Sequence, residues 1–311
     1  MRILLALLLA SAAAPRLHAE AGRTAAVTLQ RPISARAVGL GEAFAAVEGG
    51  LDSLNYNPAG LARLARPEAA SSYTRGIADD DFGSLHYAHP LRSATVSGGL
   101  LYYDAGPINI KLSDGTQHTR TAQKDVVAAG GISLPLEHGL SLGALAKVFR
   151  LELAEEVRTT GYAADIGALW RTPLKGLSLG LAAQNLGPDI KFEQEGDPLP
   201  LTLRCGAAYS VDLGRLPMFQ EGSFGFSKFL LAADAVKVRE QEVSAAAGLE
   251  MSMSLAEKSF IALRAGYQFS DEPGALALGI GLRQGPWIFD YGLGVVKDVT
   301  NSHHFNLGLK F

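Results

Sequence analysis

The sequence is poor in cysteine, in basic clusters and in long apolar runs. Cys205 is its only cysteine, so an intrachain disulfide is excluded as a source of stability. After the first nineteen residues no run of about 18 apolar residues occurs, which excludes a transmembrane helix in that part. No block of Lys or Arg is present and the formal net charge is -3, so nucleic acid is not expected as a partner.

Motifs that carry catalysis are also lacking. The Gly39-Leu40-Gly41 run has no third glycine and no preceding strand, which argues against dinucleotide binding. His86 and His89 have a ligand-like spacing, but on a strand they point to opposite faces, as do His303 and His304. No serine lies in a GxSxG turn. We therefore expect no enzyme, no cofactor and no metal ion.

The first nineteen residues have the pattern of a signal peptide. Arg2 provides the positive start, residues 3–14 form the apolar core, and cleavage is expected after Ala19. A short membrane anchor is the alternative, but a helix needs about 20 apolar residues to span a bilayer. The sequence thus predicts a signal peptide at 1–19 and export of the remainder.

Apolar residues and glycine are abundant in what remains. Hydrophobic residues make up 48% of the chain, glycine contributes 35 residues, and only 19% are charged. This composition is too apolar for a disordered chain and too rich in glycine for a helix bundle. An exported, apolar chain without helical spans fits a closed β-barrel, the other architecture that satisfies every backbone polar group in lipid.

From residue 68 onward, turn signals divide the chain into segments of strand length. We count about fourteen segments, an even number, as expected when both termini lie on one side of the membrane. Their approximate centres are residues 72, 86, 98, 130, 145, 164, 181, 205, 231, 248, 264, 279, 292 and 307. Residues 105–122 are long enough for an additional hairpin, which would change the count by two.

Alternation of side chains supports this interpretation most clearly in the last segment. Phe305, Leu307, Leu309 and Phe311 share one face, and the residues between them share the other. A terminal strand of this kind must pair with the first strand to close the barrel. Aromatic residues near other segment ends suit the girdles at the two membrane interfaces: Trp170, Tyr209, Tyr267 and Trp287.

The inward face of successive segments carries polar residues among glycine, alanine and serine. These are Asp125, Lys147, Asp165, Gln184, Arg204, Asp234, Glu250, Arg264 and Asp290. Charged groups in a membrane segment are tolerated where the interior is wet or where they are paired. Both signs are present, so a network that fills the lumen is the favoured interpretation. A polar track for a substrate is the alternative.

Residues 20–67 differ from the strand-rich part. Residues 38–47 are predicted to form a short helix, and Asn57-Pro58 enforces a turn or extended backbone. The segment is too short to bury a core of its own. We expect it to fold into the lumen of the barrel formed by 68–311, as a partly helical hatch.

Residues 34–62 resemble the amino-terminal signature of the PorV/PorQ group, which is allied to the FadL-type transporters of hydrophobic compounds. The residues that carry this hatch motif are Arg36, Gly39, Gly41, Asn55, Asn57, Pro58, Ala59 and Gly60. A weaker resemblance continues along the chain, at 165–167, 185–187, 199–206 and 263–267.

The resemblance implies an all-β fold: a transmembrane antiparallel barrel of fourteen strands with an amino-terminal hatch, in the outer membrane of a two-membrane bacterium. Its partners would be outer-membrane lipid and the assembly machinery that recognises the strand ending at Phe311. FadL-type members pass apolar molecules, often through a lateral opening, whereas PorV-type members ferry secreted cargo. The present chain is shorter than typical FadL-type members.

Two functions follow, and the first is slightly favoured. One is passage of a small hydrophobic compound, with an opening in the wall at Asp104-Ala105-Gly106-Pro107, because proline cannot donate to a strand ladder. The other is binding of secreted protein cargo by the extracellular segments 105–122, 188–198 and 212–223. A structural barrel without cargo is a third, plainer alternative.

Overall fold

The computed structural model describes residues 24–76, 80–111, 115–192, 196–212, 225–256, 258–269, 275–295 and 301–311. The predicted signal peptide, residues 1–19, lies outside the described residues. Within the described ranges, no helix is long and apolar enough to cross a membrane.

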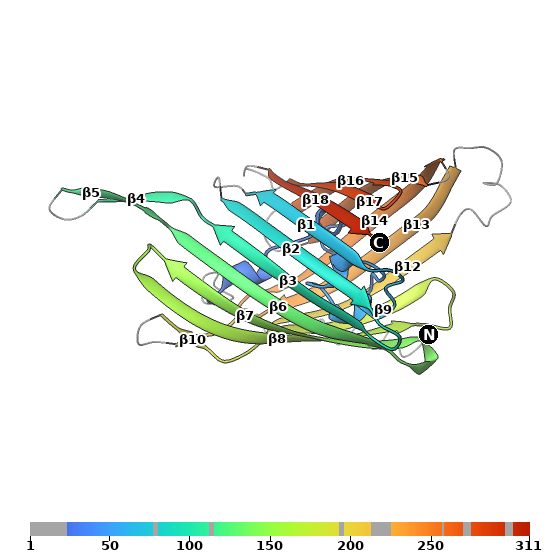
Figure 1. Cartoon of the computed structure of the whole chain (residues 1–311), viewed down its shortest axis with the longest axis horizontal. Coiled ribbons are helices and arrows are strands. Elements are labelled where there is room, and N and C mark those ends of the chain that lie inside the picture. The colour runs from blue at the N-terminus through green and yellow to red at the C-terminus, as the bar shows by residue number, and fades with distance from the viewer. Residues whose placement is uncertain are drawn as a thin grey trace.

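Fourteen antiparallel strands form one closed barrel, as Figure 1 shows, which confirms the predicted fold class. In chain order they are β1 (Glu68–Arg75), β2 (Asp81–Pro90), β3 (Thr95–Asp104), β6 (Gln123–Pro135), β7 (Leu140–Leu153), β8 (Val157–Arg171), β9 (Leu177–Leu186), β12 (Thr202–Asp212), β13 (Gly225–Val238), β14 (Val243–Ala256), β15 (Ser259–Phe269), β16 (Ala275–Gln284), β17 (Trp287–Val295) and β18 (Ser302–Lys310). Closure leaves no exposed sheet edge in the wall.

The last strand closes the barrel against the first. β18 pairs with β1 in the register that places Lys310 opposite Glu68, and the Lys310 ammonium lies 3.2 Å from the Glu68 carboxylate. The backbone N–H of Phe311 donates to the carbonyl of Pro67 at 3.0 Å. Phe305 and Leu307 project outward and His304 is buried inside, so this strand has the alternation that its sequence predicts.

The additional hairpin exists, but it is not part of the wall. β4 (Pro107–Lys111) and β5 (Gln117–Thr121) form a separate two-stranded sheet that extends β3 and β6 beyond the barrel (Figure 1). A second small sheet pairs β10 (Ile190–Lys191) with β11 (Gly196–Asp197). The wall therefore keeps its even count of strands.

The predicted opening at residues 104–107 is wrong. β3 and β6 pair without a shift in register from Thr95 to Asp104. The ladder then continues outward, because Ala105 donates to Gln123 and Ala122 donates to Gly106, each at 2.9 Å. Pro107 lies in the projecting hairpin, beyond the wall, so its missing N–H interrupts no wall pairing.

The two ends of the barrel differ. The terminus end is the end where β1 begins and β18 ends, and the loop end is the opposite one. Segments 105–122 and 188–198 lie at the loop end. β12 finishes and β13 starts at the terminus end, so segment 212–223 does not share a face with the other two, and residues 213–224 lie outside the described residues. The prediction that all three segments form one extracellular surface is wrong.

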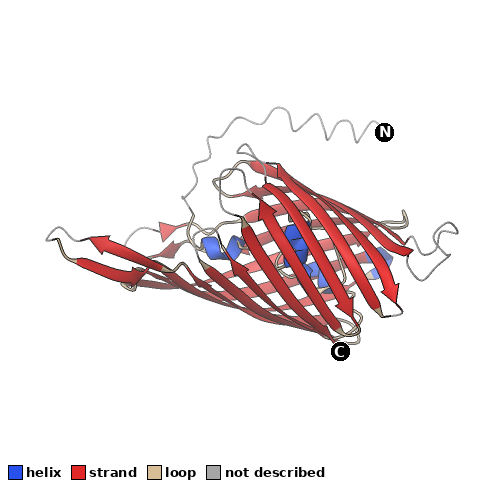
Figure 2. Cartoon of the chain, turned by 90° about the horizontal axis from the view of Figure 1, so that it is seen from above, coloured by secondary structure: helices blue, strands red, loops and turns tan. Residues whose placement is uncertain are grey.

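Residues 24–67, which we call the hatch, lie inside the ring of strands, as Figure 2 shows. Its helical turns are η2 (Val27–Gln30), α2 (Ala35–Gly39), η3 (Leu51–Ser53) and η4 (Pro58–Leu61), and a further turn, η5 (Glu137–Gly139), joins β6 to β7. The predicted helix at 38–47 is wrong, because α2 ends at Gly39. Gly41 and Glu42 both have φ of 64°, a left-handed conformation that terminates a helix.

Inward glycines allow the hatch backbone to rest directly on the wall. A Cβ atom at any of these positions would meet hatch atoms, mostly backbone. They form the glycine seat: Gly143, Gly167, Gly180, Gly248, Gly266, Gly279 and Gly292, on β7, β8, β9, β14, β15, β16 and β17. Small side chains let two backbones approach closely. The wall is therefore shaped for this hatch around much of its circumference.

Candidate functional site

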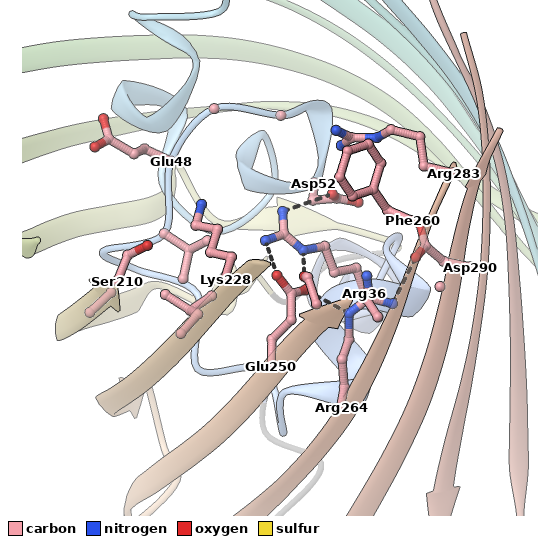
Figure 3. A pocket seen from close by; sticks show the side chains of 18 of the residues that line it. Arg36, Glu48, Asp52, Ser210, Lys228, Glu250, Phe260, Arg264, Arg283 and Asp290 are labelled. Atoms are coloured by element: carbon pink, nitrogen blue, oxygen red, sulfur yellow. Dashed lines mark hydrogen bonds and ion pairs between the residues drawn. The ribbon is translucent and has the colours of Figure 1, made fainter. Parts of the chain in front are cut away.

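Arg36 of the hatch is held at the centre of a buried chain of charges. Its guanidinium donates to both oxygens of Glu250, at 2.7 and 2.9 Å, and lies 3.6 Å from Asp52. Arg264 donates to the same Glu250 and to Asp290, both at 2.7 Å. The resulting order is Asp52–Arg36–Glu250–Arg264–Asp290, and it joins the hatch to β14, β15 and β17 (Figure 3). We call these five residues the ion chain.

The surroundings of Arg36 and Glu42 in the hatch shift the pKa values of both side chains. Burial opposes the charge of Arg36, but the hydrogen-bonded Glu250 carboxylate and then Asp52 outweigh it, so the pKa of Arg36 lies above its usual value. Glu42 accepts a hydrogen bond from Gln268 at 3.1 Å. Burial in the lumen nevertheless raises the pKa of Glu42 above the ordinary carboxyl value. Arg36 therefore binds the wall in its charged form, whereas burial disfavours the charged form of Glu42.

Two further wall residues hold the middle of the hatch. The Asp234 carboxylate on β13 accepts the backbone N–H groups of Phe44 and Ala45, each at 2.8 Å. A carboxylate that accepts backbone N–H bonds is well satisfied without a cation. On β9, Gln184 donates to the Asn55 carbonyl at 2.6 Å, and Arg204 donates to Gln184 at 2.8 Å. These contacts hold the hatch against β13 and β9, in addition to the ion chain on β14, β15 and β17.

The Asn57-Pro58-Ala59 element is seated between β6 and β8. The Asn57 amide donates to the carbonyls of Ala45 at 2.7 Å and of Ala168 at 3.0 Å, and its oxygen accepts the N–H of Ala59 at 3.1 Å. Ser133 on β6 donates to the Pro58 carbonyl at 2.6 Å. Asn57 therefore links hatch to hatch and hatch to wall at the same time, and its predicted turn forms η4.

At the loop end, residues 24–33 form a strap across the lumen. Thr28 donates to Asp125 on β6. Arg31 lies 2.6 Å from the Asp80 carboxylate, donates to the Tyr103 hydroxyl at 2.7 Å and covers the Tyr103 ring at 4.0 Å. The strap is held by few polar contacts compared with the rest of the hatch.

Beneath the strap lies a buried apolar cluster, the loop-end chamber. Its residues come from the strap, from five wall strands and from the segment between β9 and β12: Ala26, Ile33, Phe82, Leu101, Tyr103, Val127, Phe149, Leu151, Ala163, Ile190 and Leu199. The strap residues Ala25 and Leu29 pack against it. Two further apolar clusters lie between the hatch and the wall, so the lumen is filled by apolar side chains as well as by the expected charges.

Two of the predicted lumen residues do not contact the hatch. Lys147 on β7 lies 2.7 Å from the Asp165 carboxylate on β8 and donates to Asn185 at 2.9 Å. Asp165 also accepts the backbone N–H of Asn185 at 2.8 Å. The β8–β9 register shifts at this place, between Ala164 and Ile166. The three side chains therefore brace a β-bulge in the wall.

At the terminus end, a cavity of about 740 Å³ opens below the hatch. The close view in Figure 3 shows the ion chain on one side of it, with Lys228 and Arg283 reaching in from β13 and β16. Sequence reasoning missed both cations, as it missed the strap contacts and the glycine seat. Among the described residues, no group of three or more His, Cys, Asp or Glu is arranged to hold a metal ion.

The fold and the lumen define a class: a closed, fourteen-stranded transmembrane barrel whose amino-terminal segment plugs its own lumen. Solved structures share this fold. The toluene transporter TbuX of Ralstonia pickettii aligns with a TM-score of 0.57 and 12% identity over 90% of this chain and 98% of that one. The monoaromatic hydrocarbon channel CymD aligns with a TM-score of 0.60 and 10% identity over 90% of this chain and 98% of that one.

A FadL homologue of Pseudomonas aeruginosa aligns with a TM-score of 0.55 and 10% identity over 89% of this chain and 97% of that one. At such identities the likeness shows a common fold. No protein-family model matches the chain. No curated protein is similar to it in sequence.

Proposed function

We propose that this chain is an outer-membrane barrel that passes a small hydrophobic compound inward through its lumen. The observation that carries the proposal is the loop-end chamber, a packed cluster of apolar side chains inside the barrel wall, directly beneath the strap. Sites for apolar ligands are mostly apolar with a few polar groups, here Asp125, Tyr103 and Arg31, and a compound would enter by parting these side chains.

The outer surface supports a membrane location. Large apolar side chains on the outward face are exposed, among them Val148, Tyr162 and Leu181. Such a surface is stable when hydrocarbon covers it. The turns at the terminus end are short, apart from the segment after β12, whereas the loop end carries the long segments 105–122 and 187–201. By the usual orientation of such barrels, the loop end faces the outside.

The strap is the element that a compound entering from the loop end must displace. Its polar anchors are one hydroxyl, one guanidinium and the backbone N–H of Ala25, which donates to the Pro198 carbonyl at 3.0 Å. The ion chain and the glycine seat hold the remainder of the hatch. The named substrates of the structures with this fold, toluene and other monoaromatic hydrocarbons, suggest the size of compound to test.

Purified protein in liposomes is expected to accelerate the uptake of labelled toluene over empty liposomes. Leu151→Asn, which places an amide in the chamber, is expected to reduce the rate at least fivefold, because an unpaired buried amide penalises an apolar ligand. The matched control is Leu145→Asn, on the same strand and the same inward face and equally buried, but packed against the hatch. Uptake no faster than in empty liposomes would refute the proposal.

Binding of secreted cargo, the PorV-type role, is the second candidate, and the projecting β4–β5 hairpin favours it. The hairpin stands clear of the wall with Ile108 41% exposed. Crosslinking in cells is expected to capture one specific secreted protein through the native chain, and not through a chain in which residues 107–121 are replaced by a short Gly-Ser turn. Recovery of general barrel neighbours alone, from both chains, counts against this role.

A further inference from the structure

The terminus-end cavity has the size of a small-molecule site and lies apart from the loop-end chamber. Its volume of about 740 Å³ falls within the range of roughly 300–1,000 Å³ that is usual for ligand pockets. The hatch forms its roof, and the inward faces of the wall strands form its sides (Figure 3). No chamber residue lines it.

Every acid that lines this cavity already has a cationic partner. The pairs are Glu48 with Arg171, Asp52 with Arg36, Glu68 with Lys310, Glu250 with Arg36 and Arg264, and Asp290 with Arg264. The carboxylates are therefore not available to bind a cation from solution.

Two cations remain. Within the described part of the chain, Lys228 and Arg283 have neither an ion pair nor a hydrogen bond, although both line the cavity. Lys228 lies within electrostatic reach of Arg283, and Figure 3 shows the two on either side of the Arg36–Glu250 pair. The cavity is lined by six cations and five acids, so its net charge is +1, and the two cations without a contact partner reach in from β13 and β16.

Apolar side chains line the same cavity between the two cations and the hatch. Leu230 is buried, and Phe260 and Ile288 are partly buried. A bare inorganic anion would leave this apolar surface in water. An anion with an apolar body would cover it and so gain from its burial.

We propose that the terminus-end cavity is a binding site for a small organic monoanion, a carboxylate with an apolar body, held between Lys228 and Arg283. The ligand enters from the compartment at the terminus end. The site goes beyond the proposed function, because it requires only an open terminus end and no passage through the hatch.

The test is a benzoate titration of the full-length purified barrel in a non-ionic detergent, followed by ligand-observed NMR. The Lys228→Gln/Arg283→Gln double variant is expected to bind benzoate at least tenfold more weakly, since both charge-assisted contacts are lost. The affinity of the native protein is expected to fall as salt rises from 50 to 500 mM, and that of the variant to change little. The matched control is Arg150→Gln/Lys191→Gln, which removes two exposed loop-end cations that have no ion pair among the described residues, and it should stay within twofold of the native protein.

Three ligands separate the alternatives. Benzyl alcohol, the neutral counterpart, is expected to bind at least tenfold more weakly than benzoate, and inorganic phosphate likewise. Equal binding of benzyl alcohol, equal binding of phosphate, or displacement of benzoate by phosphatidylglycerol would each overturn the proposal, the last by assigning the site to a lipid headgroup. Benzoate binding that the double variant leaves unchanged would overturn it as well.

The same variants keep this inference separate from the proposed function. Toluene uptake is expected to be unchanged in the Lys228→Gln/Arg283→Gln variant, because neither residue lines the loop-end chamber. Charge-dependent benzoate binding without any toluene uptake would remove the proposed function and leave this site in place. Toluene uptake with charge-independent benzoate binding would support the proposed function and refute the anion site.

Discussion

Replacing both Gly180 and Gly266 with valine is expected to force the hatch off the wall and to open the barrel to ions. A Cβ atom at position 180 would overlap the carbonyl oxygen of Ala45, and one at position 266 would overlap the backbone at Leu40 and Gly41. In both cases the obstacle is main chain, which cannot rotate away as a side chain can. Neither glycine has a positive φ, so valine itself fits the strand conformation.

The effect should be large because the hatch has no alternative position within the lumen. Overpacking a close-packed interface commonly costs about 1–3 kcal/mol for each site. The two sites lie four strands apart in the wall, on β15 and β9, so a shift of the hatch away from one of these strands does not by itself relieve the other. The wall does not depend on the hatch for its own pairing, since every strand is bonded to two neighbours.

Single-channel conductance in planar bilayers measures the outcome, and we expect at least a tenfold increase over the native protein. Heat-modifiable migration on gels verifies that the wall remains folded. Gly130→Val is the control, because a Cβ there meets no atom within 4 Å. A folded double variant with the conductance of the native protein would show that the glycine seat does not hold the hatch.

The wall was predictable from sequence because its rule is local. Lipid and lumen demand opposite side chains at every second position, so Phe305, His304 and Leu307 reveal their sides without any knowledge of the fold. The same rule places Asp234 and Arg264 inside. Pro107 misled the prediction because proline forbids one hydrogen bond, and the sequence does not say whether that bond would lie in the wall or beyond it.

The hatch was not predictable in the same way, since its conformation is imposed by the wall. Residues 38–47 have the apolar pattern of a short helix, and in isolation that pattern is the only information available. The structure instead turns at Gly41 and Glu42 so that the backbone fits against Gly248 and Gly266. Those contacts join positions more than 200 residues apart, and no local pattern encodes them.

The sequence predicts which polar residues face inward, but it does not predict which groups they bind. Parity places Asp125 and Asp234 on the inward face, yet their partners, Thr28 and the backbone of Phe44, belong to the hatch. Lys228 was missed because it lies near the end of a strand, where charged residues are common and do not by themselves indicate a site. Its lack of a partner becomes visible only when all the pairs around the cavity are known.

Removal of Arg36 is expected to loosen the terminus-end part of the hatch while the strap stays in place. The ion chain has three acids and two bases, and Arg36→Ala leaves the buried Glu250 and Asp290 and the partly buried Asp52 with Arg264 alone. Breaking a buried pair by removal of one partner typically costs about 3–5 kcal/mol, because the remaining charge is uncompensated. Glu250 would carry most of this cost, since it loses a bidentate partner.

Hydrogen–deuterium exchange resolved along the hatch measures the effect. A loss of about 3 kcal/mol corresponds to roughly a hundredfold faster exchange at 34–56. Arg63→Ala is the matched control, since that hatch arginine makes two long hydrogen bonds, at 3.3 and 3.4 Å, to the carbonyls of Leu136 and Leu140. Arg36→Met combined with Glu250→Leu should restore most of the protection, because Arg264 and Asp290 still pair with each other, and the partly buried Asp52 keeps its hydrogen bond from Ser34. Exchange in Arg36→Ala no faster than in Arg63→Ala would mean that the glycine seat, and not the ion chain, fixes the hatch.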